Sequence, residues 1–172
     1  MSNYKEIVAK TIIGKGRKTS KDKYTLIPEY NPDTVLGCWV INNNFKGTNN
    51  KNDITINGSF DVNVWYSYDN DSKTAVTTKN FNYDDTMKLR VKDYDALNNQ
   101  NEIIIRNLKQ PTVQDVKIKN NEIILTIEKE LGVELVGEGK VKIAAYEDEL
   151  PWDDVIPDTP NDIKEEYLSD KE

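Results

Sequence analysis

The stretch that decides the fold reads Ile54-Thr55-Ile56-Asn57-Gly58-Ser59-Phe60-Asp61-Val62-Asn63-Val64-Trp65-Tyr66-Ser67-Tyr68. Its apolar side chains occupy the even positions and its small or polar ones most odd positions, which is the period of a half-buried strand. Asn57-Gly58 is also typical of a tight hairpin, but a two-residue turn there would pair Ile56 with Ser59 and mix the two faces. The pattern therefore predicts one long strand, with Gly58 as a bend or a point of close backbone approach. Trp65 alone breaks the pattern, because it lies on the polar face.

Similar patterns predict further strands along the chain, at 35–42, 73–81, 86–93, 102–108 and 133–146. The dense apolar stretch 35–42 is expected in the centre of a sheet, and the segments 43–53, 69–72 and 94–101 are expected to be loops or turns. A hairpin is predicted over 113–127, because a turn at Asn120-Asn121 keeps apolar residues paired on one face, with Ile118 opposite Ile123 and Val116 opposite Leu125.

The N-terminal 25 residues allow two structures. Residues 2–13 have the apolar spacing of a short amphipathic helix, but their β-branched residues suit a strand equally well. The following Gly14-Lys15-Gly16-Arg17-Lys18 lacks the spacing of a phosphate-binding loop. As a basic patch for nucleic acid it is short, and the chain as a whole is acidic. A solvated turn is predicted there, and no nucleic-acid partner.

These patterns together predict an all-β protein, an antiparallel sandwich or barrel of about eight or nine strands, with or without a short N-terminal helix. Residues 1–147 are predicted to form the β-rich domain. Residues 148–172 are predicted to be a flexible acidic tail that contacts client proteins or other subunits, since they are rich in acids and prolines. The spacing I-x-I-x-G-x-x-x-V-x-V at 54–64 recurs as V-x-L-x-G-x-x-x-V-x-I at 133–143. This reflects either an internal duplication or two strands that meet the same steric demand.

Composition limits the function classes. The chain has 172 residues, of which 31% are charged, and no apolar run approaches the roughly 20 residues of a membrane helix. We therefore expect no membrane insertion, and synthesis and retention in the cytosol. With no histidine, pairs of a serine or cysteine nucleophile with histidine are excluded, as are most zinc sites. The single cysteine, Cys38, is either a small buried group or the partner in an intermolecular disulfide.

Charge is concentrated at the two ends of the chain. Residues 1–25 carry seven lysines and arginines against two acids, whereas residues 147–172 carry eleven acids against two lysines. Oppositely charged ends favour head-to-tail association or separate docking surfaces, and the alternative is that both are simply solvated.

No catalytic, metal or cofactor site is predicted. Acid pairs such as those among Asp61, Asp84 and Asp85 could serve glycoside hydrolysis, but with 30 acids in the chain nothing marks one pair out. Asp69-Asn70-Asp71 resembles the start of a calcium loop without its later glycine and glutamate, so an Asx turn is favoured. For Trp65, cover by a loop, a protein interface and stacking on a sugar remain open, in that order.

Several motifs together resemble one family. Gly16-Arg17-Lys18, Leu36-Gly37-x-Trp39-Val40-Ile41-Asn42 and, above all, 61–68 (D-V-N-V-W-Y-S-Y) are similar to the outer spore-coat morphogenetic protein E family (CotE) of endospore-forming Firmicutes. The resemblance covers nearly the whole chain, although the tail is shorter and less densely acidic than in other members.

The resemblance implies a structural protein without enzymatic activity. Such a protein would assemble with itself into a layer around the forespore in the mother-cell cytoplasm. It would rest on a basement-layer coat ATPase and recruit outer-coat proteins. The resemblance also favours a protein interface over loop cover as the role of Trp65. The residues expected at contacts are Trp65, Tyr68, Arg17, Lys18, Trp152 and Tyr167. A carbohydrate-binding β-sandwich module is the alternative, which predicts a flat platform of Trp65 and another exposed aromatic residue.

Overall fold

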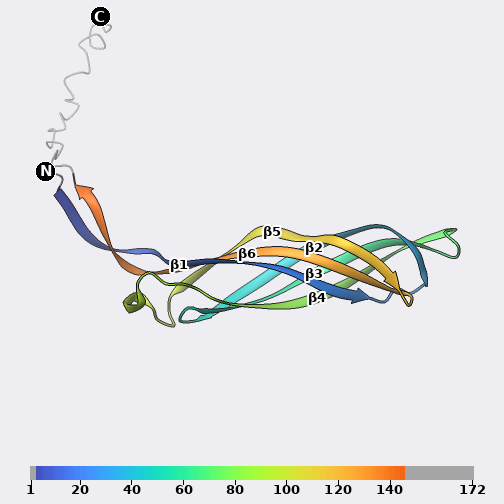
Figure 1. Ribbon diagram of the computed structural model, residues 1–172, viewed down its shortest axis with the longest axis horizontal. Coiled ribbons are helices and arrows are strands. Elements are labelled where there is room, and N and C mark those ends of the chain that lie inside the picture. The colour runs from blue at the N-terminus through green and yellow to red at the C-terminus, as the bar shows by residue number, and fades with distance from the viewer. Residues whose placement is uncertain (1–2, 146–172) are drawn as a thin grey trace, which may run out of the picture. The chain divides into compact units, whose positions relative to one another are not determined.

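The computed structural model describes residues 3–145. This part of the chain is almost entirely β-structure, in six long strands and one short 3-10 turn (Figure 1). They are β1 (Asn3–Leu26), β2 (Pro32–Asn50), β3 (Asp53–Tyr68), β4 (Lys73–Lys88), η1 (Tyr94–Ala96), β5 (Glu102–Lys119) and β6 (Glu122–Ala145). The predicted all-β antiparallel class is confirmed. The strands number six rather than eight or nine because segments predicted as separate strands run on within β4, β5 and β6.

The strands form two three-stranded sheets with the orders β1-β6-β5 and β2-β3-β4. Residues 7–141 make one compact unit, and residues 3–6 and 142–145, the ends of β1 and β6, belong to a second unit. Strand β3, which contains the alternating stretch 54–68, lies in the centre of its sheet. The expectation that 35–42 would be central is wrong, because β2 is an edge strand.

The core lies between the inner faces of the two central strands. Along residues 54–66 of β3, with the exception of Gly58, and along residues 123–135 of β6, every second residue is buried there. Side chains from both strands belong to one apolar cluster. The fully buried members are Ile54, Ile56, Phe60, Val62, Val64 and Tyr66 from β3, and Ile123, Leu125, Ile127, Leu131, Val133 and Leu135 from β6. Period-two alternation therefore places one face of each central strand in the core and the other outward.

Each central strand has a glycine where a neighbouring side chain comes close. A Cβ atom added to Gly58 would lie 2.2 Å from Cζ of Tyr83 on β4, and one added to Gly137 would lie 2.8 Å from Cδ1 of Ile13 on β1. The predicted single strand at 54–68 is confirmed, and Gly58 is a point of close approach. The shared pattern of 54–64 and 133–143 thus coincides with a shared steric demand, and their duplication stays a prediction.

Of the two structures left open for residues 3–13, the strand is the one that forms, which follows their β-branched content. Two local predictions are wrong. Residues 14–18 are not a turn but continue β1, where Gly14 bridges to Val91. Residues 43–50 are not a loop, because β2 continues through them, paired with β3, until the turn at Lys51-Asn52.

The turns that the sequence marked most clearly are confirmed. Asn120 and Asn121 turn β5 into β6 with φ values of 53° and 62°, and the pairs Ile118–Ile123 and Val116–Leu125 form as predicted. Asparagine tolerates this left-handed conformation better than most residues. The turn at 69–72 and the irregular segment at 94–101 also appear where they were expected.

Candidate interaction surface

Apolar side chains gather on the outer face of the sheet β2-β3-β4. Cross-strand pairing aligns Gly37 with Trp65 and Trp65 with Val76, and in the next outward row it aligns Trp39 with Asn63. Residues paired in this way share a face. We call Trp39, Ile41, Trp65 and Val76 the tryptophan patch; their exposed fractions are 44, 40, 43 and 59%. Trp65 is therefore half-exposed, and no loop within residues 3–145 covers it.

The two tryptophan rings flank the bare backbone of Gly37. A Cβ atom at Gly37 would lie 3.7 Å from Cζ3 of Trp39 and 4.0 Å from Cε3 of Trp65. Aromatic rings that pack beside a strand glycine replace the missing side-chain contacts. Each ring thus has one side against the sheet and the other toward solvent, which presents a large and rigid apolar surface.

The surroundings of the patch carry few free charges. The carboxylate of Asp61 accepts hydrogen bonds from the side-chain amides of Asn42 (2.9 Å) and Asn80 (2.8 Å), and these bonds hold the pKa of Asp61 below its usual value. Thr78 donates to the side-chain oxygen of Asn63 (2.6 Å). Asp61 is therefore an ionised group at the border of the patch, whereas Asn63 and Thr78 present an amide and a hydroxyl, whose removal from water costs much less than that of a charge.

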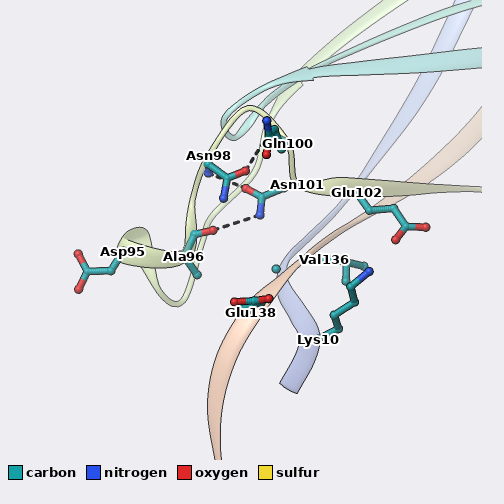
Figure 2. Close-up of a pocket in the computed structure, with 10 residues that line it drawn as sticks. Lys10, Asp95, Ala96, Asn98, Gln100, Asn101, Glu102, Val136 and Glu138 are labelled. Atoms are coloured by element: carbon teal, nitrogen blue, oxygen red, sulfur yellow. Dashed lines mark hydrogen bonds between the residues drawn. The ribbon is translucent and has the colours of Figure 1, made fainter. Parts of the chain in front are cut away.

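A polar depression of about 360 Å³ lies beside the segment that joins β4 to β5 (Figure 2). The amide of Asn101 donates to the carbonyl of Ala96 (3.1 Å) and accepts from the backbone N–H of Asn98 (2.7 Å). The side chain of Asn98 in turn accepts from the N–H of Gln100 (2.8 Å). These amides are used to hold the loop, so we assign the depression a structural role.

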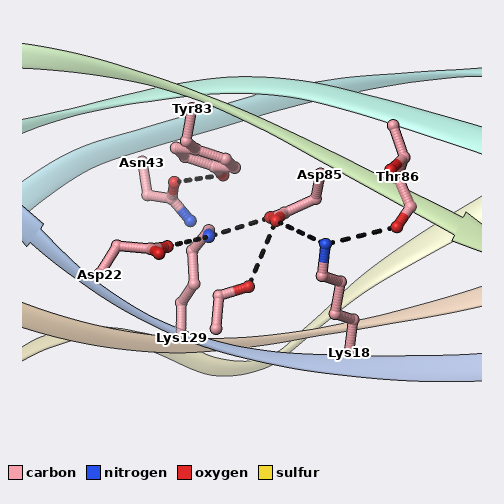
Figure 3. Close-up of polar contacts among 8 residues, drawn as sticks. Lys18, Asp22, Asn43, Tyr83, Asp85, Thr86 and Lys129 are labelled. Atoms are coloured by element: carbon pink, nitrogen blue, oxygen red, sulfur yellow. Dashed lines mark hydrogen bonds and ion pairs between the residues drawn. The ribbon is translucent and has the colours of Figure 1, made fainter.

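A charged cluster crosses the core between the two sheets (Figure 3). The ammonium of Lys129 on β6 lies 2.9 Å from a carboxylate oxygen of Asp85 on β4, and their side chains are only 3% and 7% exposed. Lys18 lies 3.4 Å from the other oxygen of Asp85, and Ser20 donates to that oxygen (3.2 Å). Lys129 also lies 4.3 Å from the ring centre of Tyr83. Asp85 thus links β4 to β1 and to β6.

The electrostatics of this cluster favour the ionised carboxylate. Burial by itself raises the pKa of Asp85, but the hydrogen bond and charge of Lys129, and then those of Lys18, outweigh it and hold the pKa below its ordinary value. Burial, and then the charge of Asp85, raise the pKa of Tyr83 to about 12. Asp85 is therefore a buried anion whose charged form is stabilised by two lysines.

This cluster was not predicted, although the position of Lys129 in the sequence indicates it. Lys129 has the same parity as Ile127 and Leu131, so it interrupts the inward row of β6. A charge at an inward position requires a partner from the facing sheet. Asp85 was noted only as one of many acids.

The three acids considered for glycoside hydrolysis do not form a pair. Asp85 faces the core, whereas Asp61 and Asp84, the residue before Asp85, point outward. Asp61 pairs with Asn80, so Asp84 lies four residues further along β4. That offset is roughly 13 Å along a strand, more than the separation of about 6 to 10 Å that hydrolysis uses.

Within residues 3–145 we find no group of three or more cysteine, aspartate or glutamate side chains arranged to hold a metal ion. The described part of the chain also has no helix long and apolar enough to cross a membrane.

The comparison with protein families gives one match. The family model described as outer spore coat protein E (CotE) matches residues 3–171. The chain belongs to this family. It is therefore assigned to a family of structural proteins of the outer spore coat. Searches of curated proteins and of solved structures gave no significant match.

The remaining predicted contact residues lie apart from the tryptophan patch. Tyr68 stacks on Tyr30, with ring centres 4.2 Å apart. Arg17 and Lys18 belong to β1 in the other sheet, where Arg17 lies 3.5 Å from Glu130 and Lys18 contacts Asp85 as described above. Trp152 and Tyr167 lie outside the described residues. The roles of these residues in contacts stay predictions.

Cys38 lies on β2 opposite Val64 and beside the tryptophan patch in sequence. Its side chain is half-buried against the core, and burial raises the pKa of the thiol. A raised pKa lowers the fraction of thiolate, the form that reacts in disulfide exchange. This favours the packing role for Cys38, and the intermolecular disulfide stays a prediction.

Proposed function

We propose that this chain is a structural morphogenetic protein that assembles with itself into a scaffold layer of the outer spore coat. The scaffold forms on the forespore in the mother-cell cytoplasm, over the basement-layer coat ATPase, and recruits other outer-coat proteins without catalysing a reaction. Family membership supports the coat role, and the tryptophan patch supports the self-association.

The exposure of the tryptophan patch is the observation that carries this proposal. Two indole rings and two aliphatic side chains lie together on one sheet face with few charges around them. Tryptophan in such a position is enriched at the centres of protein interfaces. A second copy of the chain would cover these rings, and such a contact would join the subunits of a scaffold.

Light scattering and electron microscopy of the purified chain test the proposal. We expect the wild-type chain to form large assemblies, and the double variant Trp39→Thr/Trp65→Thr to remain dissociated at concentrations where wild type assembles. Tyr94→Ser is the matched control, because Tyr94 is 66% exposed and lies away from the patch. A wild-type chain that stays monomeric at high micromolar concentration would overturn the proposal.

Carbohydrate binding remains the second candidate, because Trp39 is the further exposed aromatic residue that this function requires beside Trp65. Sugars that stack on indole rings change their fluorescence. Titration of the chain with coat and cell-wall glycans separates the two functions: saturable quenching that is lost in Trp65→Thr favours sugar binding. Unchanged fluorescence together with self-association favours the scaffold.

A further inference from the structure

The outer face of the other sheet, β1-β6-β5, carries an apolar depression with a basic rim. Gly132 supplies the floor on β6, and Leu108, which is 52% exposed, leans over it: a Cβ atom at Gly132 would lie 2.9 Å from Cδ1 of Leu108. Lys15, Arg17, Arg106 and Glu134 also line this space of about 330 Å³. We call it the Gly132 depression.

The rim holds more cations than acids, and its contacts are loose. Lys15 and Arg106 share Glu134 at 3.6 and 3.4 Å, and Arg17 lies 3.5 Å from Glu130. These distances exceed the roughly 2.7 to 2.9 Å of a strong charge-assisted hydrogen bond. The side chains of Lys15, Arg17 and Arg106 are 72, 78 and 59% exposed. Each guanidinium has five N–H donors, so the rim keeps donors for a further anion.

The chain itself contains a segment of complementary chemistry. Residues 147–172 carry eleven acids against two lysines, whereas the remaining residues carry nineteen acids against 21 lysines and arginines. Within the segment, Trp152 directly precedes Asp153 and Asp154. An indole fits an apolar floor and stacks on guanidinium groups, and the two following carboxylates suit arginine side chains.

We propose that the Gly132 depression binds the acidic segment 147–172 of a second copy of the chain. The indole of Trp152 packs on the exposed side chain of Leu108, which fills the space over Gly132, and the carboxylates of Asp153 and Asp154 bind Arg17 and Arg106. This proposal rests on the proposed self-association and gives it a second contact. The tryptophan patch joins copies through apolar surface, and this contact joins them head to tail through charge. Because the contact is electrostatic, salt weakens it more than it weakens the patch.

Fluorescence anisotropy of a labelled peptide of residues 147–172, added to the full-length chain, tests the proposal directly. We expect saturable binding that weakens as salt increases. Arg17→Glu/Arg106→Glu should weaken it by about tenfold or more, since two rim charges are reversed. The matched control is Lys117→Glu/Lys119→Glu, which makes the same charge change on β5 outside the depression and should leave the affinity within about twofold. Circular dichroism checks that both variants are folded.

A second peptide, in which Trp152 is replaced by alanine, tests the seat for the indole. It should bind at least about tenfold more weakly than the native peptide, as for removal of a central aromatic contact. Equal binding of both peptides, equal losses in both charge-reversed chains or no binding of the native peptide would each overturn the proposal. A wild-type chain that assembles but does not bind the native peptide would refute this contact and leave the proposed scaffold function standing.

Discussion

The two sheets share one construction on their inner faces and differ on their outer faces. Outward acids of β6 are paired with cations from the flanking strands, as in Lys109–Glu128 (3.2 Å) and Arg17–Glu130 (3.5 Å). Outward positions of β3 instead carry Thr55, Asn57, Ser59, Asp61, Asn63 and Trp65. One face is thus covered by ion pairs, and the other by mostly uncharged groups around the tryptophan patch, with Asp61 as the acid among these residues of β3.

This difference separates two ways in which copies of the chain can meet. Charged side chains keep a sheet face soluble and restrict it to partners of opposite charge. A face with few charges and exposed indole rings loses less on leaving water, so it can be covered by apolar surface. We therefore expect copies of the chain to pack closely through the outer face of the sheet β2-β3-β4 and to make charge-selective contacts through that of the sheet β1-β6-β5.

The largest predicted effect concerns the inner faces, where Asp85 on β4 connects the sheets through ion pairs with Lys129 on β6 and Lys18 on β1. Asp85→Ala leaves the ammonium of Lys129 buried near Tyr83 without its main partner. We expect a loss of about 3 to 5 kcal/mol in the free energy of unfolding, measured by denaturant titration.

The paired replacement Asp85→Leu/Lys129→Met is the control for this prediction. It removes both charges, and apolar side chains of similar size should recover most of the loss. If the double variant were as unstable as Asp85→Ala, the uncompensated charge of Lys129 would not explain the single variant, and the ion pair itself would be a requirement of the fold.

A cation placed within the outer face that carries few charges should make this face resemble that of the other sheet. Asn63 lies between Trp39 and Thr78 in their row, so Asn63→Lys adds an ammonium to the border of the patch without removing either indole. We expect self-association to weaken by about 2 to 3 kcal/mol, roughly 30- to 150-fold, as measured by sedimentation. Thr112→Lys, on the charged face opposite Glu128, is the control; equal weakening in both variants would contradict the division between the faces.

Much of the fold was predictable from period-two alternation, and the misses have physical reasons. The strand at 54–68 and the turn at Asn120-Asn121 were found because parity and turn chemistry are local properties. The continuous course of β2 through its asparagines was missed because pairing with β3 overrides their weak strand propensity.

The candidate surface was predictable only in part. Trp65 was identified because it broke the alternation of its own strand. Its companions Trp39 and Val76 lie on neighbouring strands, and their position beside Trp65 depends on cross-strand register. The register of β2 against β3 shifts at three places, between Pro32 and Thr34, between Val35 and Gly37 and between Ile41 and Asn44. These shifts could not be inferred from alternation, since each bulge changes which residues face outward.

The acid side of the stability profile should report on Asp85. Its folded-state pKa lies below its ordinary value, so its ionised form stabilises the fold. That contribution is complete above the unfolded-state pKa of about 3.9 and is lost as the pH falls through the lower, folded-state pKa. Wild type should therefore lose more stability below about pH 4 than Asp85→Asn, which cannot titrate.

The slope of stability against pH, and not its level, is the quantity to compare, because Asp85→Asn is less stable at neutral pH. Both chains should carry Asn63→Lys, so that self-association does not alter the measured stability. Parallel profiles for the two chains would show that other carboxylates govern acid unfolding.

The smallest predicted effect concerns the turn of the charged sheet. Asn121 has a φ of 62°, which glycine adopts without the steric cost that a side chain adds. Glycine also gives the unfolded chain more freedom, which opposes this gain. We expect Asn121→Gly to raise the free energy of unfolding by less than about 1 kcal/mol, and Asn121→Ala, which has a Cβ but no amide, to lower it. The outer surface of each sheet should be unaffected, so self-association should equal that of wild type. A change in self-association would mean that the β5–β6 hairpin contributes to contacts between copies, and that the charged sheet packs as closely as its partner sheet does.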